Sequence, residues 1–225
     1  MLRLRQVVVA ARDLGATRTR IEDELRLPHV WADPGVGHFG LRNALYAVGD
    51  CFLEVVSPVK DDAPAARFLE RAGRDAGYMV IVQTTDALDD VRTRADGLGI
   101  RTVFTADGDG VTGIHFHPAD TEGALLSIDR CTVDAAWPWA GPAWEAAPDR
   151  GYRGLRRATI AVDDPKTVAG RWAELLGASA DGASIALSDS ALDFVDGDGG
   201  LCAVDLVGPA HAPVEIAGVT FSSGE

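Results

Sequence analysis

The chain has 225 residues, of which 47% are apolar and 24% are charged, as is typical of a soluble globular protein. Its formal net charge is −13, and its two lysines are Lys60 and Lys166. Such a surface repels nucleic acid and anionic membrane, so a small molecule or another protein chain is the expected partner. Three widely spaced cysteines without a CxxC pair, and an opening MLRLRQ that leads directly into a strand, predict a cytoplasmic protein with reduced thiols and no signal peptide.

The first 59 residues predict a strand, a helix and two further strands. Leu4–Ala11 is an apolar run rich in β-branched residues, and Ala16–Leu25 has the apolar spacing of a helix. His29–His38 is rich in glycine and proline and is expected to be a loop. The unit is therefore expected to end in a hairpin.

The hairpin lies in FGLRNALYAVGDCFLEVVSPV, with strands at Asn43–Val48 and Cys51–Val56 around a Gly-Asp turn. Both faces of the second strand are mostly apolar, so Glu54 is expected to point into a partly buried space. An unpaired buried charge costs several kcal/mol or shifts its pKa, so this carboxylate needs a partner. The possible partners are a metal ion, a bound ligand, or an arginine such as Arg5 or Arg42.

Residues 77–131 repeat the same order of elements. A helix is expected to begin at Asp86 as N-cap and to end at Gly99. Residues 61–76 form a linker with helical character. The expected strands are Gly77–Thr84, Ile100–Thr105, Thr112–Pro118 and Ala124–Arg130. Two copies of one βαβββ unit are therefore predicted.

A connection rich in proline and tryptophan follows at residues 132–151, and a less regular third copy of the unit occupies residues 152–225. Its expected elements are a strand at Leu155–Val162, a helix at Thr167–Leu176, and strands at Ser184–Leu187, Leu192–Val195, Cys202–Val207 and Ile216–Phe221. We therefore predict an α+β fold with a two-module domain at residues 1–131. A lone module leaves a sheet edge and an apolar face open, so the third module is expected to pack on the first domain or to pair with its copy in a homodimer.

Two stretches resemble the vicinal oxygen chelate superfamily, in its glyoxalase-like branch for FGLRNALYAVGDCFLEVVSPV and its epimerase branch for GIHFHPADTEGALLSID. The resemblance implies paired βαβββ modules that form a curved mixed-sheet half-barrel pair. It also implies a small-molecule lyase or isomerase acting next to a carbonyl, with or without a divalent metal (zinc, iron, nickel or manganese). The alternatives are a metal-free binding or sequestration protein of the bleomycin-resistance type, and a structural or regulatory dimer with a vestigial cavity.

In this superfamily each module presents one cavity residue from its first strand and one from its last. The resemblance places these residues at Gln6 and Glu54 in the first module, and at Met79 or Val80 and at Ser127 in the second. Gln6 stands where a histidine is usual, and Ser127 stands where a glutamate is usual. Two of the four expected ligands are missing from the second module, which puts the usual metal site in question.

His115 and His117 alternate on one predicted strand, so both imidazoles are expected on one face. With Glu54 they would form a His/His/carboxylate set of the kind that zinc or ferrous iron accepts. The alternative is that the pair orders the turn at Pro118–Thr121 or hydrogen-bonds a ligand. The full set of candidates is Glu54 and His115 for catalysis, Gln6, Glu54, His115 and His117 for a metal, and His38, Asn43 and Ser127 for substrate.

Three tryptophans in the connection, Trp137, Trp139 and Trp144, have two possible roles. They could cap the cavity of the two-module domain. Alternatively, they fasten the connection onto the barrel by burying large apolar surfaces, and this interpretation is preferred.

Overall fold

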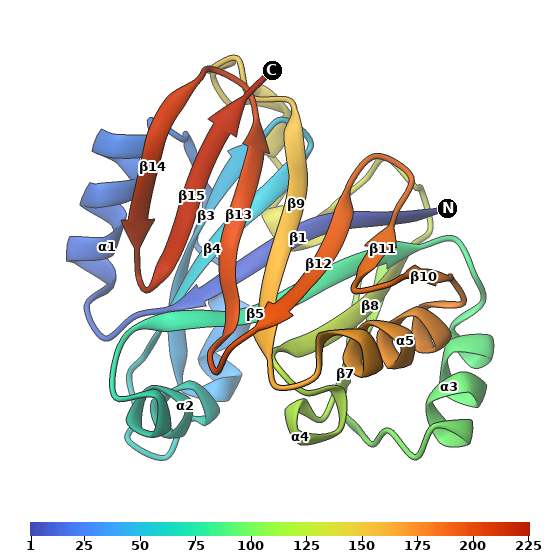
Figure 1. Ribbon diagram of the computed structural model, residues 1–225. Helices are drawn as coiled ribbons and strands as arrows, with labels where there is room; N and C mark the ends of the chain where they lie inside the picture. The colour runs from blue at the N-terminus through green and yellow to red at the C-terminus, as the bar shows by residue number, and fades with distance from the viewer.

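The computed structural model describes residues 1–225, and its strands form two mixed sheets that lie one over the other. Figure 1 shows the second sheet in front of the first, with helices at the sides and below. This α+β architecture of two curled sheets matches the predicted fold class. No helix is long and apolar enough to cross a membrane.

The first sheet contains both predicted βαβββ units, in the strand order β2-β3-β4-β1-β5-β8-β7-β6. Each unit pairs its first and last strands in parallel (β1 with β4, β5 with β8), and the units meet where β1 and β5 pair antiparallel. The strands are β1 (Leu2–Ala10), β2 (His29–Trp31), β3 (Leu41–Val48), β4 (Cys51–Pro58), β5 (Ala76–Thr84), β6 (Thr102–Gly108), β7 (Val111–Phe116) and β8 (Leu125–Cys131).

The helices follow the predicted order, with two differences in detail. The predicted loop at residues 29–38 contains β2 and the 3-10 helix η2 (Pro34–Phe39). The helix of the second unit has Ala87 as N-cap, whereas the Asp86 carboxylate accepts a hydrogen bond from Arg94 instead. The remaining helices are α1 (Leu14–Arg20), which continues as the π-helix η1 (Ile21–Leu25), α2 (Pro64–Ala72), α3 (Leu88–Gly97), α4 (Pro118–Thr121), η3 (Pro138–Ala140), η4 (Trp144–Ala146) and α5 (Pro165–Leu176).

The second sheet has the order β10-β11-β12-β9-β13-β15-β14. It repeats the pairing of the first sheet, but its second half has no helix. The predicted strand Ile216–Phe221 is wrong, because Ala217 and Gly218 adopt positive φ angles of 49° and 71° and turn the chain between two strands. The strands are β9 (Gly154–Val162), β10 (Ala180–Asp181), β11 (Ser184–Ala186), β12 (Ala191–Asp196), β13 (Gly200–Val207), β14 (His211–Ile216) and β15 (Val219–Gly224).

The two sheets share one apolar core, which also takes in buried faces of α1, α3 and α5. The third module therefore packs on the first domain, which is one of the two arrangements expected for it. The backbones approach closely where β5 crosses β13: a Cβ on Gly77 would lie 2.1 Å from the carbonyl oxygen of Leu201. Only a residue without a side chain allows this contact.

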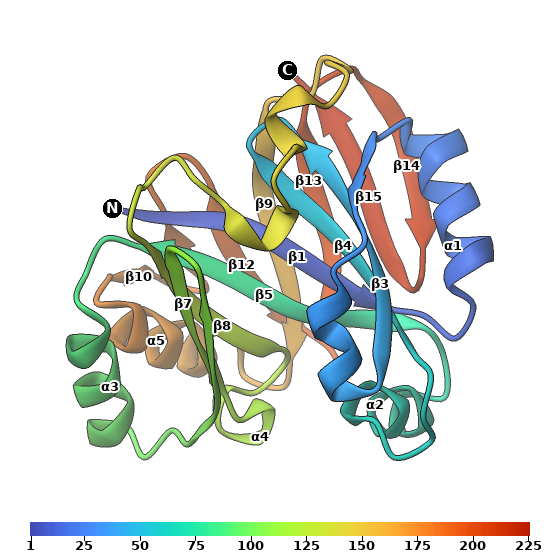
Figure 2. The same cartoon turned by 180° about the vertical axis from the view of Figure 1, so that it is seen from behind.

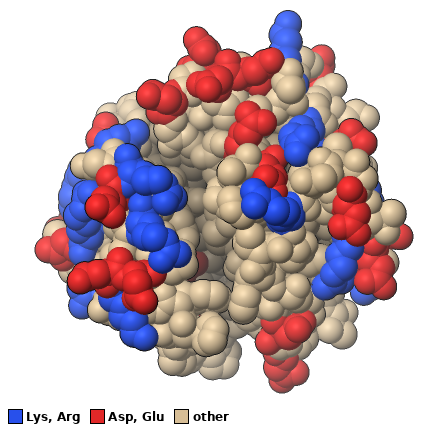
Figure 3. All heavy atoms as spheres, turned by 90° about the horizontal axis from the view of Figure 1, so that it is seen from below, with Lys and Arg blue, Asp and Glu red and all other residues tan.

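The opposite face of the first sheet carries a separate apolar cluster, formed with α2 and the connection. Figure 2 shows this face, with the connection (residues 132–151, yellow) lying across it in front of β1. Figure 3 shows that the molecule is hollowed beside a group of charged side chains on the face seen from below. We use the term hollow for the side of the first sheet that carries this cluster and faces away from the shared core.

Candidate functional site

Polar side chains project from the middle of the first sheet toward the hollow. One row of paired residues crosses four strands there: Gln6 pairs with Ile81, Ile81 with Ser127, and Ser127 with His115. Glu54 lies on the neighbouring strand β4, opposite Val8. Because successive side chains alternate between faces, these residues point away from the core shared with the second sheet.

Two amide side chains hold the carboxylate of Glu54. Gln6 Nε2 donates to one oxygen at 2.7 Å, and Asn43 Nδ2 donates to the other at 2.7 Å. Glu54 is 8% exposed, Gln6 2% and Asn43 5%. The partner that the sequence required is therefore a pair of neutral amides, and no arginine or other charged group is bound to this carboxylate in the structure.

The orientation of both amides is fixed by a second contact. Trp137 Nε1 donates to Gln6 Oε1 at 2.8 Å, and the backbone N–H of Asp33 donates to Asn43 Oδ1 at 2.8 Å. Each amide oxygen is thereby occupied, so each NH₂ group must face Glu54. These hydrogen bonds form a continuous chain that runs from the connection through β1 and β4 to β3 and on to Asp33.

Burial raises the pKa of Glu54 to about 7. The hydrogen bonds from Asn43 and Gln6 act in the opposite direction, because they favour the charged form, while the nearby charge of Asp33 raises the pKa further. Burial is the largest of these effects. Glu54 can therefore both release and accept a proton near neutral pH, as a general acid or base must.

A second buried carboxylate, Asp129, lies on the same face of β8, two residues beyond Ser127. It accepts hydrogen bonds from the Ser127 hydroxyl and, at 2.7 Å, from Trp139 Nε1. A Cβ on Gly113 would lie 2.7 Å from its oxygens, so the carboxylate lies directly against that glycine. Burial raises the pKa of Asp129 to about 6, against these two hydrogen bonds.

The three candidate histidines lie in different surroundings. His115 packs edge-on against Phe104, with ring centroids 5.5 Å apart, and burial lowers its pKa to about 4, so it is neutral at pH 7. His117 caps α4, because its Nδ1 accepts a hydrogen bond from the backbone N–H of Ala119 at 3.1 Å. His38 is exposed, beside Phe39.

The residues of the hollow do not fit a divalent metal. No three His, Cys, Asp or Glu side chains come together in a set that could hold one. Both oxygens of Glu54 already accept N–H groups, and the oxygen of Gln6 is used by Trp137. The ring nitrogen Nδ1 of His117 is engaged in the cap of α4. Such a donor set leaves no open cluster of oxygen and nitrogen ligands.

The connection covers part of this face of the sheet, at Gln6 and at Asp129, with two of its tryptophans. Trp137 is 1% exposed and stacks on Phe52 at 6.4 Å between ring centroids, with the Arg5 guanidinium 5.4 Å from the centre of its ring. Trp139 binds Asp129, as described above. Arg5 also pairs with Asp50 at 3.4 Å, so it is not a partner of Glu54. The tryptophans thus fasten the connection and cover part of the hollow at once.

Asp129 is not among the site residues predicted from the sequence. The resemblance directed attention to Ser127, where the superfamily usually has a glutamate, and Asp129 is the next acidic residue on the same face of that strand. Period-two alternation was the available signal. Burial of Asp129 depends on Trp139, which lies outside the repeated units, and that contact has no local sequence signature.

Comparison with known proteins identifies the family. The glyoxalase-like domain family matches residues 7–176. No curated protein sequence is significantly similar to the chain.

Three solved structures illustrate the similarity of the fold. A methylmalonyl-CoA epimerase in complex with methylmalonyl-CoA and NH₄⁺ is 19% identical with a TM-score of 0.53, covering 60% of this chain and 97% of its own. A hypothetical protein from Bacillus halodurans C-125 is 15% identical with a TM-score of 0.52, covering 60% and 99%. The epimerase from Mycobacterium tuberculosis is 24% identical with a TM-score of 0.50, covering 57% and 87%. The chain therefore belongs to the glyoxalase-like domain family of the vicinal oxygen chelate superfamily.

Proposed function

We propose that this chain is a small-molecule lyase or isomerase that moves a proton on the carbon next to a carbonyl, with Glu54 as the acid–base group. The observation that carries the proposal is a buried carboxylate, Glu54, that is bound by two neutral amides and by no cation, and this burial raises its pKa to about 7. At neutral pH both forms of its carboxyl group are populated, which suits proton transfer in either direction. Glu54 is held in place by Gln6 and Asn43 rather than neutralised by a cation.

A reaction of this kind also needs a group that stabilises negative charge on the carbonyl oxygen. His115 is the candidate, because its neutral imidazole retains an N–H donor at pH 7. It lies in the row of paired residues that includes Gln6 and Ser127. In the proposal, substrate binds over this row, with Ser127 and Asn43 along its path and His38 near the aromatic side chains at the edge.

The names of the solved relatives support the reaction class and suggest the first compounds to test. The epimerases share the fold with this chain, and their names describe epimerisation of methylmalonyl-CoA. A CoA thioester is therefore a reasonable first class of compound to test.

Metal assistance is not part of the proposal, because the residues of the hollow do not fit a metal ion. We expect dialysis against EDTA to leave the thermal melting temperature and any measured turnover unchanged. Loss of turnover on dialysis, restored by zinc, iron, nickel or manganese, would show that the metal-free reaction is wrong.

The decisive experiment is proton exchange in D₂O. The protein is incubated with 2-branched acyl-CoA thioesters, and deuterium at the carbon next to the carbonyl is followed by NMR. We expect exchange whose rate changes with an apparent pKa near 7, and its loss in Glu54→Gln. Glu70→Gln, which alters an exposed carboxylate on α2, is the matched control and should retain full exchange. Exchange that survives in Glu54→Gln would rule out the assigned role.

A metal-free binding protein is the second candidate, and it too has a specific observation in its favour. Met79 and Ser127 occupy two positions where the superfamily usually has metal ligands, and aromatic side chains gather on the same side of the first sheet: Phe39, Phe104, Trp137 and Trp139. A binder would retain a ligand without exchanging its protons. Equal affinity of wild type and Glu54→Gln for such a ligand, with no exchange in either, would favour this candidate. The homodimer stays a prediction, which sedimentation can check.

A further inference from the structure

Tyr78 brings a hydroxyl group to the hollow that the proposed proton transfer does not use. It lies on β5 at an irregularity: Met79 pairs with Val8 and Gly77 pairs with Val9, so Tyr78 is an extra residue without a partner on β1. Such a β-bulge breaks the strict alternation of side chains along a strand. Tyr78 and Met79 therefore both pack with the apolar cluster of the hollow, while Gly77 lies against the second sheet.

The strand pairing brings Tyr78 close to the acid–base group. Glu54 on β4, Val8 on β1 and Met79 on β5 lie opposite one another in the first sheet. Neighbouring strands are about 4.8 Å apart, so roughly 10 Å separate the backbones at Glu54 and Met79. Tyr78 is the residue before Met79, so a small molecule bound over this row can contact the side chains of both Glu54 and Tyr78.

The electrostatics of Tyr78 agree with this position. Burial raises the pKa of its phenol, the charges of Arg67 and Arg71 act in the opposite direction, and the charge of Glu54 raises the pKa further. Interactions between charges weaken with distance, so an effect of Glu54 on Tyr78 requires that the two side chains lie near each other. With a raised pKa the hydroxyl keeps its proton at neutral pH and remains a hydrogen-bond donor.

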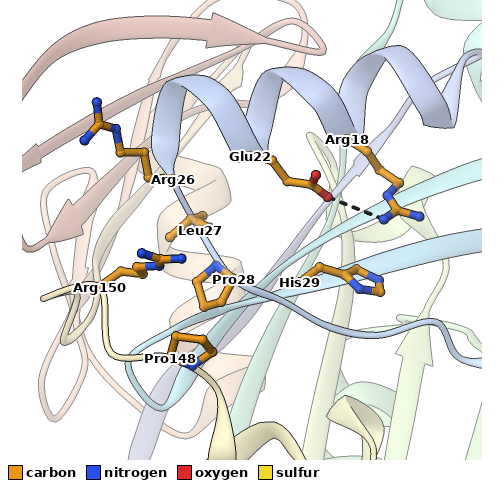
Figure 4. A pocket seen from close by; sticks show the side chains of 8 residues that line it. All are labelled: Arg18, Glu22, Arg26, Leu27, Pro28, His29, Pro148 and Arg150. Atoms are coloured by element: carbon orange, nitrogen blue, oxygen red, sulfur yellow. Dashed lines mark hydrogen bonds and ion pairs between the residues drawn. The ribbon is translucent and has the colours of Figure 1, made fainter.

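The three tyrosines of the chain differ in what their hydroxyl groups bind. Tyr46 donates at 3.2 Å to Glu22, the carboxylate whose ion pair is drawn in Figure 4. Tyr152 donates at 2.8 Å to a backbone oxygen of η1. These two hydroxyl groups alone are hydrogen-bonded within the protein, although Tyr78 is also partly buried. Buried tyrosine hydroxyls usually find a partner, so the free hydroxyl of Tyr78 is available to a bound molecule.

Tyr78 lies at the end of the hollow away from the connection. Its ring packs edge-on against Phe68 of α2, with ring centroids 5.0 Å apart. Figure 2 shows α2 and the connection at opposite ends of this side of the first sheet. The molecule is hollowed in the view from below, which is the end at which α2 lies in Figure 1 (Figure 3). The tyrosine is therefore fixed by an aromatic contact where a substrate can approach Glu54.

We propose that the Tyr78 hydroxyl donates a hydrogen bond to the carbonyl oxygen of the substrate during proton transfer at Glu54, with His115 as the second donor. Glu54 takes the proton from the carbon next to the carbonyl, and the electron pair of that C–H bond moves to the carbonyl oxygen. Tyr78 keeps its own proton and stabilises the negative charge on that oxygen until Glu54 returns the proton to carbon. This role rests on the proposed function, which it extends by one catalytic residue.

The test measures deuterium exchange in D₂O over a range of concentrations of 2-branched acyl-CoA thioesters, with wild type and Tyr78→Phe. The substitution removes only the hydroxyl and retains the ring that packs on Phe68. We expect the maximal exchange rate to fall by about a hundredfold with KM almost unchanged, because the hydrogen bond strengthens as charge develops on the oxygen. The melting temperature should stay the same, since no hydrogen bond within the protein is lost.

The matched control is Tyr152→Phe, which removes a hydroxyl that binds the backbone outside the hollow. It should lower the melting temperature and leave exchange unchanged. Exchange at the wild-type rate in Tyr78→Phe, or a change confined to KM, overturns the role of Tyr78 while Glu54 keeps its own. Absence of exchange in the wild type, or exchange that survives in Glu54→Gln, overturns the proposed function itself and the role of Tyr78 with it.

Discussion

The two sheets place a polar residue and a carboxylate at the same positions and surround them differently. In the first sheet Glu54 on β4 lies opposite Val8, two residues beyond Gln6 on β1. In the second sheet Asp193 on β12 lies opposite Thr159, two residues beyond Arg157 on β9. The correspondence continues into the helices. Asp13 lies seven residues after Gln6 and Asp164 lies seven residues after Arg157, and these two aspartates are the N-caps of α1 and α5.

The difference lies in what neutralises the carboxylate. Arg157 forms ion pairs with Asp193 and, at 3.7 Å, with Asp205, on the face of the second sheet turned away from the shared core. Glu54 has only neutral amides and lies beneath the connection. An arginine supplies the countercharge directly, whereas a buried acid without one must take up a proton. One strand framework can therefore hold either a salt bridge or a proton carrier.

The largest expected effect comes from Glu54→Ala, and it depends on pH. The pKa of Glu54 is about 7 in the folded protein and near 4.5 when unfolded, so the folded state binds more protons between these values. The wild-type free energy of unfolding therefore falls by about 3 kcal/mol as pH rises through this window. Glu54→Ala has no carboxyl group here to titrate, so its free energy of unfolding does not fall in this window. We therefore expect the substitution to lower the free energy of unfolding by roughly 2–3 kcal/mol more at pH 5 than at pH 8.

Urea unfolding at both pH values measures this difference. All other groups titrate in both proteins, so the comparison of wild type with variant isolates Glu54. The same cost at pH 5 and pH 8 would contradict a raised pKa for this carboxyl group.

A smaller effect is expected from Trp137→Phe, which retains an aromatic ring but removes the donor to Gln6 Oε1. We expect a loss of about 1–2 kcal/mol in the free energy of unfolding, because a buried oxygen loses its partner. The amide of Gln6 is then free to turn its oxygen toward Glu54, which favours the protonated acid and raises its pKa further.

Infrared titration of the carboxyl groups can measure this shift. The matched control is Trp139→Phe, which removes the donor to Asp129 and should raise the pKa of that residue instead. A Glu54 titration that is the same in wild type and Trp137→Phe would show that the connection does not influence the site.

The smallest effect is expected in the second sheet. Asp193→Asn removes the ion pair with Arg157, whose side chain is 43% exposed. Such pairs contribute about 0–1 kcal/mol, so we expect a loss within that range that shrinks in high salt. Thermal unfolding at low and high salt measures it. A loss as large as that of Glu54→Ala would mean that the two carboxylates are not in contrasting surroundings.

Much of the fold could be predicted because its signals are local. The hairpin around Gly49 and the inward direction of Glu54 follow from turn chemistry and period-two alternation, and the structure confirms them. The predicted strand Ile216–Phe221 failed because apolar residues on both sides of a two-residue turn look like one continuous strand.

The sequence by itself determined which side chains share a face, because alternation along a strand depends only on neighbouring residues. Tertiary structure decided what those side chains meet. Gln6 and Trp137 are 131 residues apart, and no local pattern joins them. The second contact that fixes the Gln6 amide and the cover over Asp129 arise only when the connection folds back over the first sheet. Burial and partners set the pKa of a carboxyl group, so its chemistry was decided at that level.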